Sequence, residues 1–369
     1  MAATRKKKIR RIGVLTGGGD CPGLNAVIRG VSKAAMLDHG ISVLGFVDGF
    51  WGLVESRFRE LDFMSVSGIL TTGGTILGTS NIANPFRHPE KNKKGELVLR
   101  DRSARAVANC KRLKIDALVT IGGDGTQSIA YRLMKKGVPV VGVPKTIDND
   151  LNNTDVTFGF DTAVQTAVEA IDKIHTTAMS HHRVMIVEVM GRYAGWIALH
   201  AGVASGSDVV LIPEIPYDIN KVCEFVLQRS RVGKRFSIVC VSEGARPKGG
   251  KMTVAKIVKE STDPIRLGGI GNVVGEQITR CTGLETRTCV LGHIQRGGTP
   301  SAFDRVLATT FGTHAMNMVS KRKFGRMVSF KNWKVTDVTM LSAVKKQKLV
   351  SRNHQLVKTA KAVGTCFGD

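Results

Sequence analysis

The sequence predicts an α/β protein of two domains, each a parallel-type sheet wound with helices. The chain has 369 residues, which at roughly 150 residues per domain suggests two domains. Short apolar runs alternate with amphipathic, helix-like stretches, and this alternation is typical of wound parallel sheets. Glycine-rich loops follow two of the apolar runs directly. Since ligands bind beyond the carboxyl ends of strands in such sheets, these loops are the first places to look for a site.

The individual elements follow from the spacing of apolar residues along the chain. In the first half we expect strands at 9–16, 116–121 and 138–143, and helices at 24–37 and 126–136. In the second half we expect a helix at 161–179, with Asp161 as its N-cap, and strands at 184–189, 209–212 and 237–241.

The net charge of +24 lies mostly at the two ends of the chain, with +6 in residues 1–11 and +10 in residues 320–369. The span between them keeps +8, which suits a protein that handles small phosphorylated anions, because a basic cleft concentrates them. Nucleic-acid binding by the basic ends is the alternative. No basic motif with interleaved aromatic residues supports that alternative.

The composition also bears on location. No apolar run approaches the roughly 20 residues of a membrane span, and the apolar stretch after the basic first residues breaks at Gly17, too early for a signal peptide. We therefore expect a soluble, cytoplasmic protein. The seven cysteines have neither metal-site nor disulfide-framework spacing and are expected to be reduced thiols.

Two glycine-rich loops are candidates for phosphate binding. In residues 17–20, consecutive glycines let backbone N–H groups face an anion at a helix start, although a tight turn is the alternative. Residues 122–126 have the sequence Gly-Gly-Asp-Gly-Thr, and Asp124 would repel phosphates unless a cation lay between them. Mg²⁺ is the expected cation, with Gly125 and Thr126 beside the phosphates. A turn-forming role for Asp124 is the alternative.

Asp148 and Asp150 alternate in an extended or turning segment, and in a strand they would share a face. One could act as general base toward a substrate hydroxyl while the other orients it or belongs to the metal environment. Phosphoryl transfer to an alcohol needs such a base, a metal and cations over the transferring group. The candidate cations are Arg183, Arg192, Arg287 and Arg296. Taken singly, an arginine is more readily explained as a surface ion-pair residue.

Three segments carry a more specific pattern: Thr-Ile-Asp-Asn-Asp at 146–150, Met-Gly-Arg at 190–192 and Leu-Gly-His-Ile-Gln-Arg at 291–296. In this order and spacing they closely resemble the 6-phosphofructokinase family, from about Ile9 to Gly325. The 122–126 loop also resembles NAD kinases and lipid kinases of the same superfamily. Neither of these alternatives accounts for the segment from His293 to Arg296.

The resemblance implies an active site in the cleft between the two domains. It implies a phosphoryl-donor domain of residues 1–159 plus about 295–345, a fructose-6-phosphate domain of residues 160–294, and a basic C-terminal tail of residues 346–369. Asp148 is similar to the base that deprotonates the sugar 1-hydroxyl, Thr146 and Arg192 to its catalytic partners, and Asp124 to the magnesium ligand, with Asp150 nearby.

The resemblance also implies two binding sets. The sugar-phosphate set is Thr146, Ile147, Asp148, Arg183, Met190, Gly191, Arg192, Glu243, Arg287, His293 and Arg296. In the family, the arginines corresponding to Arg183 and Arg287 reach into a neighbouring subunit's site. The nucleotide set is Gly18, Gly19, Phe50, Gly122, Gly123, Asp124, Gly125 and Thr126.

The phosphoryl donor depends on Gly125 and Lys145. In this family an Asp at the position of Gly125 marks pyrophosphate users, because its carboxylate repels the α-phosphate of ATP. Lys145, in contrast, is similar to the lysine of pyrophosphate users. Because the repulsive residue is missing, we expect ATP and keep the pyrophosphate-dependent enzyme as the alternative. Asn81 stands where an arginine is often found beside the donor phosphates.

The resemblance thus implies a Mg²⁺-dependent ATP:fructose-6-phosphate 1-phosphotransferase of glycolysis, as a homotetramer or a dimer. Such a kinase should keep its activity without residues 1–8 and 345–369. Allosteric control stays open. Arg29, Lys33, Asp208 and Lys234 match a family effector site, whereas Phe63 and Phe236 stand where basic residues are common.

Overall fold

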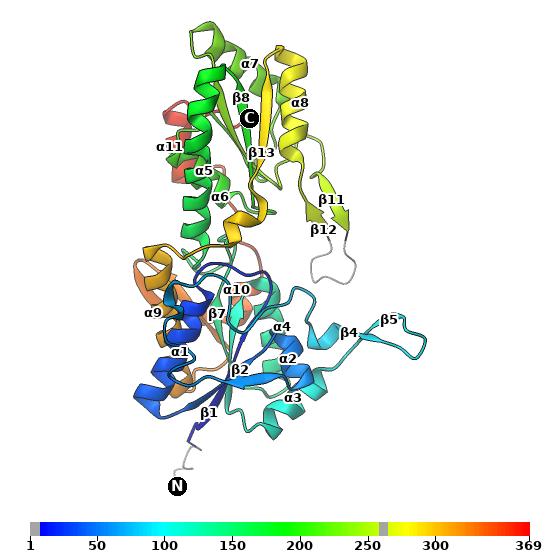
Figure 1. Cartoon of the computed structure of the whole chain (residues 1–369), viewed down its shortest axis with the longest axis vertical. Coiled ribbons are helices and arrows are strands. Elements are labelled where there is room, and N and C mark those ends of the chain that lie inside the picture. The colour runs from blue at the N-terminus through cyan, green and yellow to red at the C-terminus, as the bar shows by residue number, and fades with distance from the viewer. Residues whose placement is uncertain (1–7, 258–264) are drawn as a thin grey trace.

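Two parallel sheets, each covered by helices, form the two halves of the molecule (Figure 1). The computed structural model describes residues 8–257 and 265–369. Buried residues from both halves join in one apolar cluster, so the halves share a continuous core. The expected α/β class with wound, parallel-type sheets is confirmed.

The larger sheet has seven strands in the order β15-β14-β7-β6-β1-β2-β3. They are β1 (Arg11–Thr16), β2 (Ser42–Phe46), β3 (Phe58–Glu60), β6 (Ala117–Gly122), β7 (Val140–Pro144), β14 (Arg326–Lys331) and β15 (Lys334–Thr339). The strands from β14 to β2 pair in parallel, whereas β3 and β15 at the edges are antiparallel. The three strands expected in the first half are confirmed, with ends shifted by one or two residues.

Helices cover both faces of this sheet because its central strands are apolar on both sides. The helices are α1 (Leu24–His39) and α9 (Ala302–Ser320) on one face, and α2 (Phe50–Glu55), α3 (Ser103–Arg112), α4 (Asp124–Lys135) and α10 (Met340–Val344) on the other. The helices α1 and α9 pack backbone to backbone, since a Cβ at Gly30 would lie 2.8 Å from the Thr309 carbonyl oxygen.

The smaller sheet has four parallel strands in the order β13-β8-β10-β9. They are β8 (Val184–Val189), β9 (Val209–Leu211), β10 (Ser237–Ser242) and β13 (Thr286–Val290). Its helices are α5 (Phe160–His181), α6 (Trp196–Ala204) and α11 (Gln355–Ala362) on one face, and α7 (Ile219–Arg231) and α8 (Ile270–Thr282) on the other. The strands expected in this half are confirmed.

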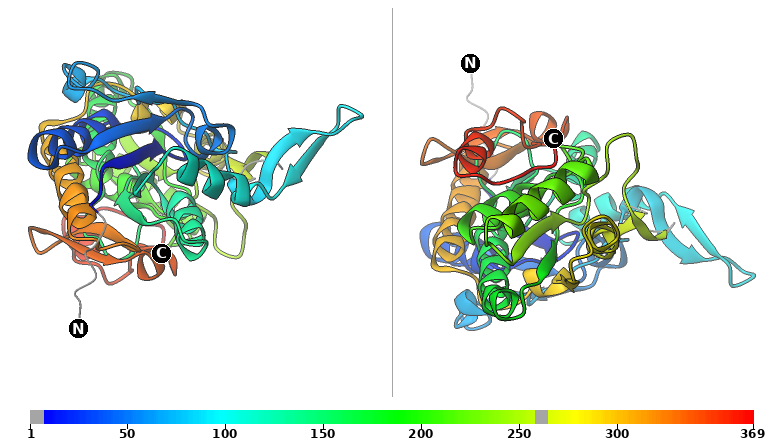
Figure 2. Two further views of the ribbon diagram at one scale, coloured as in Figure 1. Left: turned by 90° about the horizontal axis from the view of Figure 1, so that it is seen from below. Right: turned by 90° about the horizontal axis from the view of Figure 1, so that it is seen from above.

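Two antiparallel hairpins extend from the halves. One consists of β4 (His88–Lys91) and β5 (Leu97–Arg100) and projects from the body of the molecule (Figure 2). The other consists of β11 (Val254–Ile257) and β12 (Ile265–Leu267) and extends from the smaller half toward the larger one (Figure 1). Short 3₁₀ turns occur at η1 (Ile69–Thr71), η2 (Pro85–Arg87) and η3 (Gly292–Arg296).

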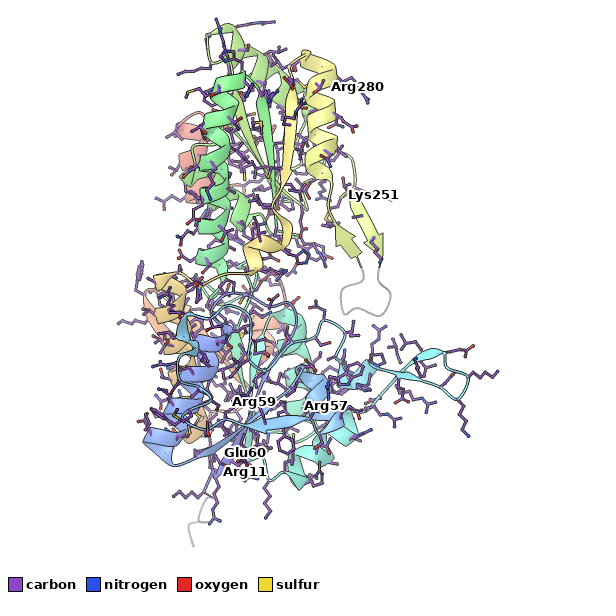
Figure 3. All side chains as sticks on the ribbon, viewed as in Figure 1. Arg11, Arg57, Arg59, Glu60, Lys251 and Arg280 are labelled. Carbon is purple, nitrogen blue, oxygen red and sulfur yellow. A yellow bond between two sulfur atoms is a disulfide. The ribbon has the colours of Figure 1, made fainter. Side chains whose placement is uncertain are left out.

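Basic side chains are distributed over both halves, as the labelled Arg11, Arg57, Lys251 and Arg280 illustrate in Figure 3. Residues 1–7 of the basic N-terminal arm lie outside the described residues. No helix in the described part of the chain is long and apolar enough to cross a bilayer.

Two local expectations were wrong. Gly159, with φ of 92°, caps α5, and Asp161 lies in the first turn, where it accepts a 2.5 Å hydrogen bond from the Ser301 hydroxyl. Cys223 and Cys281 form a disulfide between α7 and α8 rather than staying reduced.

The expected basic C-terminal tail is a packed part of the smaller half. Val350, Val357 and Phe367 are at most 3% exposed. The Cys366 backbone extends β9 through a parallel bridge to Val209, and Figure 2 shows this red segment on the side of the molecule away from the β4–β5 hairpin. Removing residues 345–369 would therefore expose core, so we no longer expect a chain without them to keep its activity.

The packed C-terminus predicts a stability effect far from the cleft. Phe367→Ala should lower the free energy of unfolding by about 3 kcal/mol or more, because Phe367 is 1% exposed and its removal leaves a cavity. Val363→Ala in the same segment, at a site 76% exposed, should change it by less than ~0.5 kcal/mol. Urea unfolding of both variants tests this. Equal, small changes would mean that the segment is a solvated tail.

Candidate active site

A cavity of about 860 Å³ lies between the two halves and is lined by residues from both. The larger half contributes the loops after β1, β6 and β7, and the smaller half the segments after β8, β10 and β13. These are all carboxyl ends of parallel strands, where wound sheets bind ligands. The predicted residues that line the cavity are Gly18, Gly19, Phe50, Asn81, Gly123, Asp124, Gly125, Thr126, Lys145, Thr146, Asp148, Asp150, Met190, Arg192, Glu243, His293 and Arg296.

The conformation of the loop after β1 is fixed by hydrogen bonds to neighbouring backbone and side chains. Gly18 has φ of 78°, a conformation that favours glycine. Its N–H donates to the Ser80 carbonyl at 3.3 Å, and its carbonyl accepts from the Thr79 hydroxyl at 2.6 Å. The segment that carries Thr79 and Ser80 therefore fixes the shape of this loop.

The loop after β6 opens directly into α4, where Asp124 and Gly125 are exposed to the cavity. The Gly125 N–H donates to the Asp124 carboxylate at 2.7 Å, and nothing lies within 4 Å of where a Gly125 Cβ would stand. Gly122, in contrast, does not line the cavity. A Cβ there would lie 2.4 Å from the Thr126 side chain, so this glycine makes room for packing.

One buried side chain ties two of the loops together. Gln127 is fully buried and donates from Nε2 to the carbonyl of Gly122 at 3.0 Å and to that of Val143 at 2.9 Å. Gly122 is the last residue of β6 and Val143 the second-last residue of β7. This amide therefore reinforces the pairing of the two strand ends.

Two cations hold the loop after β1 from inside the cavity. Lys145 is 4% exposed and its ammonium donates to the Gly19 carbonyl. Burial lowers the pKa of Lys145. Arg296 donates from Nη1 to the Asp20 carbonyl at 3.1 Å, and a Cβ at Gly19 would lie 2.8 Å from that guanidinium. Arg296 thus connects the smaller half to a loop of the larger one.

The segment Thr146–Asp150, which we call the base turn, carries both predicted carboxylates. It follows β7 as a turn rather than a strand, because Asn149 between the two acids has φ of 51°. The Asp148 N–H donates to the Thr146 hydroxyl at 3.1 Å, and Ile147 anchors the turn in the core at 1% exposure. Ile147 therefore does not line the cavity.

The two carboxylates of the base turn are electrostatically strained. Burial raises the pKa of Asp148 to about 6, opposed most strongly by Arg296 and reinforced by Glu243. Burial also raises the pKa of Asp150, and the charges of Asp148 and Asp124 add to this effect. Within the described residues, no donor reaches Oδ1 of Asp148, although that oxygen is buried. The Asp148 residue as a whole is half-buried and lines the cavity, so its carboxylate can face a bound hydroxyl.

The residues predicted to bind the sugar phosphate line the same cavity as the base turn, and most of them come from the smaller half. Met190 and Arg192 follow β8, and burial raises the pKa of Glu243 while Arg192 and Arg296 oppose the rise. Gly191 lies behind this wall with φ of 132°, and its carbonyl accepts from the Ser242 hydroxyl at 2.5 Å. Like Gly122, it serves packing and does not contact the cavity.

Arg183 and Arg287 do not reach the cavity of their own chain. Both pair with Glu285, Arg183 at 3.0 Å. Arg287 lines a second cavity of about 440 Å³, together with residues of α8. Within one chain the structure does not bring these two arginines to the base turn.

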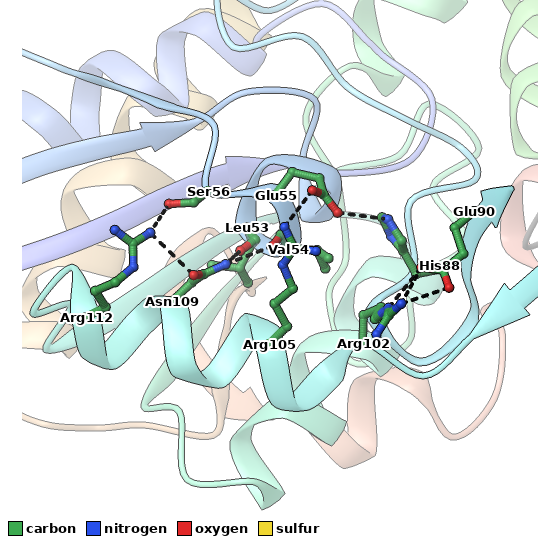
Figure 4. Close-up of polar contacts among 10 residues, drawn as sticks. All are labelled: Leu53, Val54, Glu55, Ser56, His88, Glu90, Arg102, Arg105, Asn109 and Arg112. Carbon is green, nitrogen blue, oxygen red and sulfur yellow. Dashed lines mark hydrogen bonds and ion pairs between the residues drawn. The ribbon is translucent and has the colours of Figure 1, made fainter. Parts of the chain in front are cut away.

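Phe50 reaches the cavity from the first residue of α2, and Figure 4 shows how this short helix is anchored to α3. Asn109 donates to two backbone carbonyls of α2 at 2.9 and 2.8 Å. Glu55 accepts from Arg105 at 2.8 Å and lies 3.4 Å from His88. These contacts fix the wall of the cavity that Phe50 forms.

Several residues that line the cavity were not predicted from the sequence. They are Asp20, Ser80, Ala83, Ile129, Tyr193, Lys256, Leu267 and Gln347. Asp20 and Tyr193 adjoin predicted residues and could have been found by extending those motifs. Lys256 and Leu267 lie on the β11–β12 hairpin and Gln347 in the C-terminal segment, and neither place carries a motif.

Comparison with known proteins shows the family to which the chain belongs. A family model described as phosphofructokinase matches residues 11–319. The chain is 52% identical over 365 residues to ATP-dependent 6-phosphofructokinase 2 of Clostridium perfringens, covering 98% of this chain and 99% of the relative. It is 50% identical over 341 residues to a pyrophosphate–fructose 6-phosphate 1-phosphotransferase of Streptomyces coelicolor, covering 92% and 96%.

The fold comparison points the same way. The solved phosphofructokinase of Pichia pastoris in the T-state superposes with a TM-score of 0.77 at 30% identity, covering 98% of this chain and 37% of the yeast chain. With the family model spanning most of the chain and relatives matching over nearly its full length, the chain belongs to the phosphofructokinase family.

Proposed function

We propose that this protein is an ATP-dependent 6-phosphofructokinase, which transfers a phosphoryl group to the 1-hydroxyl of fructose 6-phosphate and forms fructose 1,6-bisphosphate. The observation that carries the proposal is the half-buried Asp148, which lines one cavity between its donor-side and sugar-side loops. A carboxylate in this position can accept the hydroxyl proton as the oxygen attacks phosphorus.

The surrounding residues support this division of labour. Arg192 and Arg296 provide positive charge beside Asp148, and with Met190, Glu243 and His293 they form the proposed sugar-phosphate wall. The Thr146 hydroxyl fixes the backbone of the base turn. We further propose that the larger half binds the donor and the smaller half binds the sugar.

Mg²⁺ fits the donor side, where the protein and the substrate phosphates would bind it together. No cluster of three or more metal-binding side chains occurs within residues 8–257 and 265–369, but Mg²⁺ in kinases is held by one or two carboxylates plus substrate phosphates. Asp124 is exposed to the cavity and its charge raises the pKa of Asp150, so a cation here would relieve repulsion between carboxylates. When bound, Mg²⁺ neutralises charge on the transferring phosphates.

ATP is favoured over pyrophosphate by the space at Gly125. Nothing lies within 4 Å of where a Gly125 Cβ would stand, which leaves space for the α-phosphate, and Gly125 itself brings no carboxylate against it. Lys145, the residue that suggests pyrophosphate, already donates to the Gly19 carbonyl. The relatives carry both names at about equal identity, so the donor has to be argued from these residues.

Two further proposals concern the assembly and its location. Arg183 and Arg287 lie away from their own cavity, which supports a homo-oligomer in which they serve a neighbouring subunit's site. The proposed substrates are water-soluble metabolites of glycolysis, and this supports the cytoplasm as the location.

The donor assignment is tested by bisphosphate formation from fructose 6-phosphate and Mg²⁺, with ATP or pyrophosphate. We expect activity with ATP, and Gly125→Asp should abolish it because a carboxylate would face the α-phosphate. Gly125→Ala is the matched control and should keep most activity, since a Cβ meets nothing within 4 Å. Activity of the wild-type chain with pyrophosphate alone would reverse the assignment.

The raised pKa of Asp148 predicts a pH dependence. The base works only when deprotonated, so kcat/KM for fructose 6-phosphate should fall as pH drops through about 6. Glu243→Gln removes a charge that raises the pKa of Asp148 and should move this limb to lower pH. The sugar phosphate's own titration would not move in the variant. A limb that stays in place would assign it to the substrate.

Burial of the base also predicts a gain in stability when its charge is removed. Because the folded-state pKa of Asp148 is raised, its ionised form destabilises the fold at neutral pH. Asp148→Asn should therefore raise Tm at pH 7.5 while lowering kcat by roughly 10²–10⁴, and the gain should vanish toward pH 4. Asp38→Asn, at an exposed position, should change neither. Unchanged kcat in Asp148→Asn would remove it from the role of base.

A further inference from the structure

A short stretch of the C-terminal segment, Gln347–Val350, runs between the base turn and the sugar-side loops, and we call it the strap. On the larger half, the Lys348 N–H donates to the Asp150 carbonyl at 2.7 Å. On the smaller half, the Lys348 carbonyl accepts from Trp196 Nε1 at 2.8 Å. The Val350 N–H donates at 2.8 Å to Glu214. One segment of four residues thus contacts both halves of the molecule.

The contacts on the smaller half lead to the sugar-side segment. Glu214 also accepts from the Gly195 N–H at 3.0 Å, and Gly195 is the N-cap of α6. The segment from Met190 to Tyr193, which lines the cavity, ends at this point. Through Glu214 and Trp196 the strap therefore holds the place where that segment enters its helix.

The contacts on the larger half converge on the Lys348 ammonium. It donates to Asn149 Oδ1 at 2.8 Å and to the carbonyls of Thr154 and Asp155 at 2.9 Å each. An ammonium group has three N–H donors, and all three are used here. Lys348 thus binds the base turn to the loop that follows it.

Asn149 is the residue of the base turn that most needs such support. It is 5% exposed and has φ of 51°, a left-handed conformation that non-glycine residues rarely adopt. It stands between the proposed base and Asp150, so its backbone determines where both carboxylates point. The Lys348 ammonium fixes its side chain from one side, and the Asp155 carbonyl accepts from its Nδ2 at 3.4 Å.

We propose that Lys348 is a positioning residue for phosphoryl transfer, which fixes Asn149 and so aligns the base turn with the sugar-side wall. The inference rests on the proposed function, in which Asp148 is the base. Lys348 itself does not line the cavity, whereas its neighbour Gln347 does. Its effect is therefore on alignment and not on substrate contact.

The main test is the Lys348→Met variant, which keeps the aliphatic stem and removes the charge. Because a displacement of about 1 Å at a reacting group can cost 10²-fold, kcat per folded protein should fall about 10- to 100-fold. KM for ATP should stay within about twofold. Lys348→Arg should recover part of kcat. Lys346→Met, at an exposed lysine two residues earlier, is the matched control and should behave as wild type.

Hydrogen exchange on the substrate-free chain gives a readout that does not need activity. In Lys348→Met, amides of residues 147–155 should exchange roughly tenfold faster, and those of β6 should not. If that variant does not fold, Asn149→Ala removes the acceptor instead and should lower kcat in the same way. Wild-type kcat per folded protein, or unchanged exchange at 147–155, would overturn the inference. Absence of wild-type activity with either donor would instead contradict the proposed function.

Discussion

The cavity is organised by one electrostatic constraint, which is that two carboxylates two residues apart, Asp148 and Asp150, lie half-buried on the same turn. Burial alone raises the pKa of both Asp148 and Asp150, and an unpaired buried charge is strongly unfavourable. Cations from both halves lie near the base turn, and Arg296 and Arg192 most strongly oppose the rise in the pKa of Asp148. The positive charges that line the cavity thus stabilise the ionised form of the proposed base.

This constraint explains why the two halves cannot act independently. Arg296 comes from the smaller half, compensates Asp148 on the larger half and donates to the Asp20 carbonyl of the glycine loop after β1. The sequence resemblance placed it on the sugar-phosphate side alone. In the structure the same guanidinium also reaches the donor loop, so a change in the distance between the halves alters the base, the loop and the sugar wall together.

Much of the fold and of the site followed from local patterns. Strand, glycine loop and helix follow one another directly along the chain, and motifs such as 122–126 and 146–150 are contiguous, so they can be recognised without knowing the packing. Gly122 and Gly191 were assigned to ligands, but their missing side chains make room for Thr126 and Ser242. The charge of the C-terminal segment suggested an exposed tail, but its apolar Val357 and Phe367 are buried. The predictions that failed were those that depend on side-chain packing, which local patterns do not show.

Overall sequence identity to the relatives does not decide which phosphoryl donor the site binds. Relatives at about 50% identity are named for ATP and for pyrophosphate, so the discriminating residues are too few to influence identity. Gly125 lacks the carboxylate that would repel the α-phosphate of ATP. This absence allows ATP to bind but does not exclude pyrophosphate. At Lys145 the ammonium is turned toward the Gly19 carbonyl. A lysine held by the protein's own backbone must lose that contact before it can favour a smaller donor, whereas the space at Gly125 is available at once.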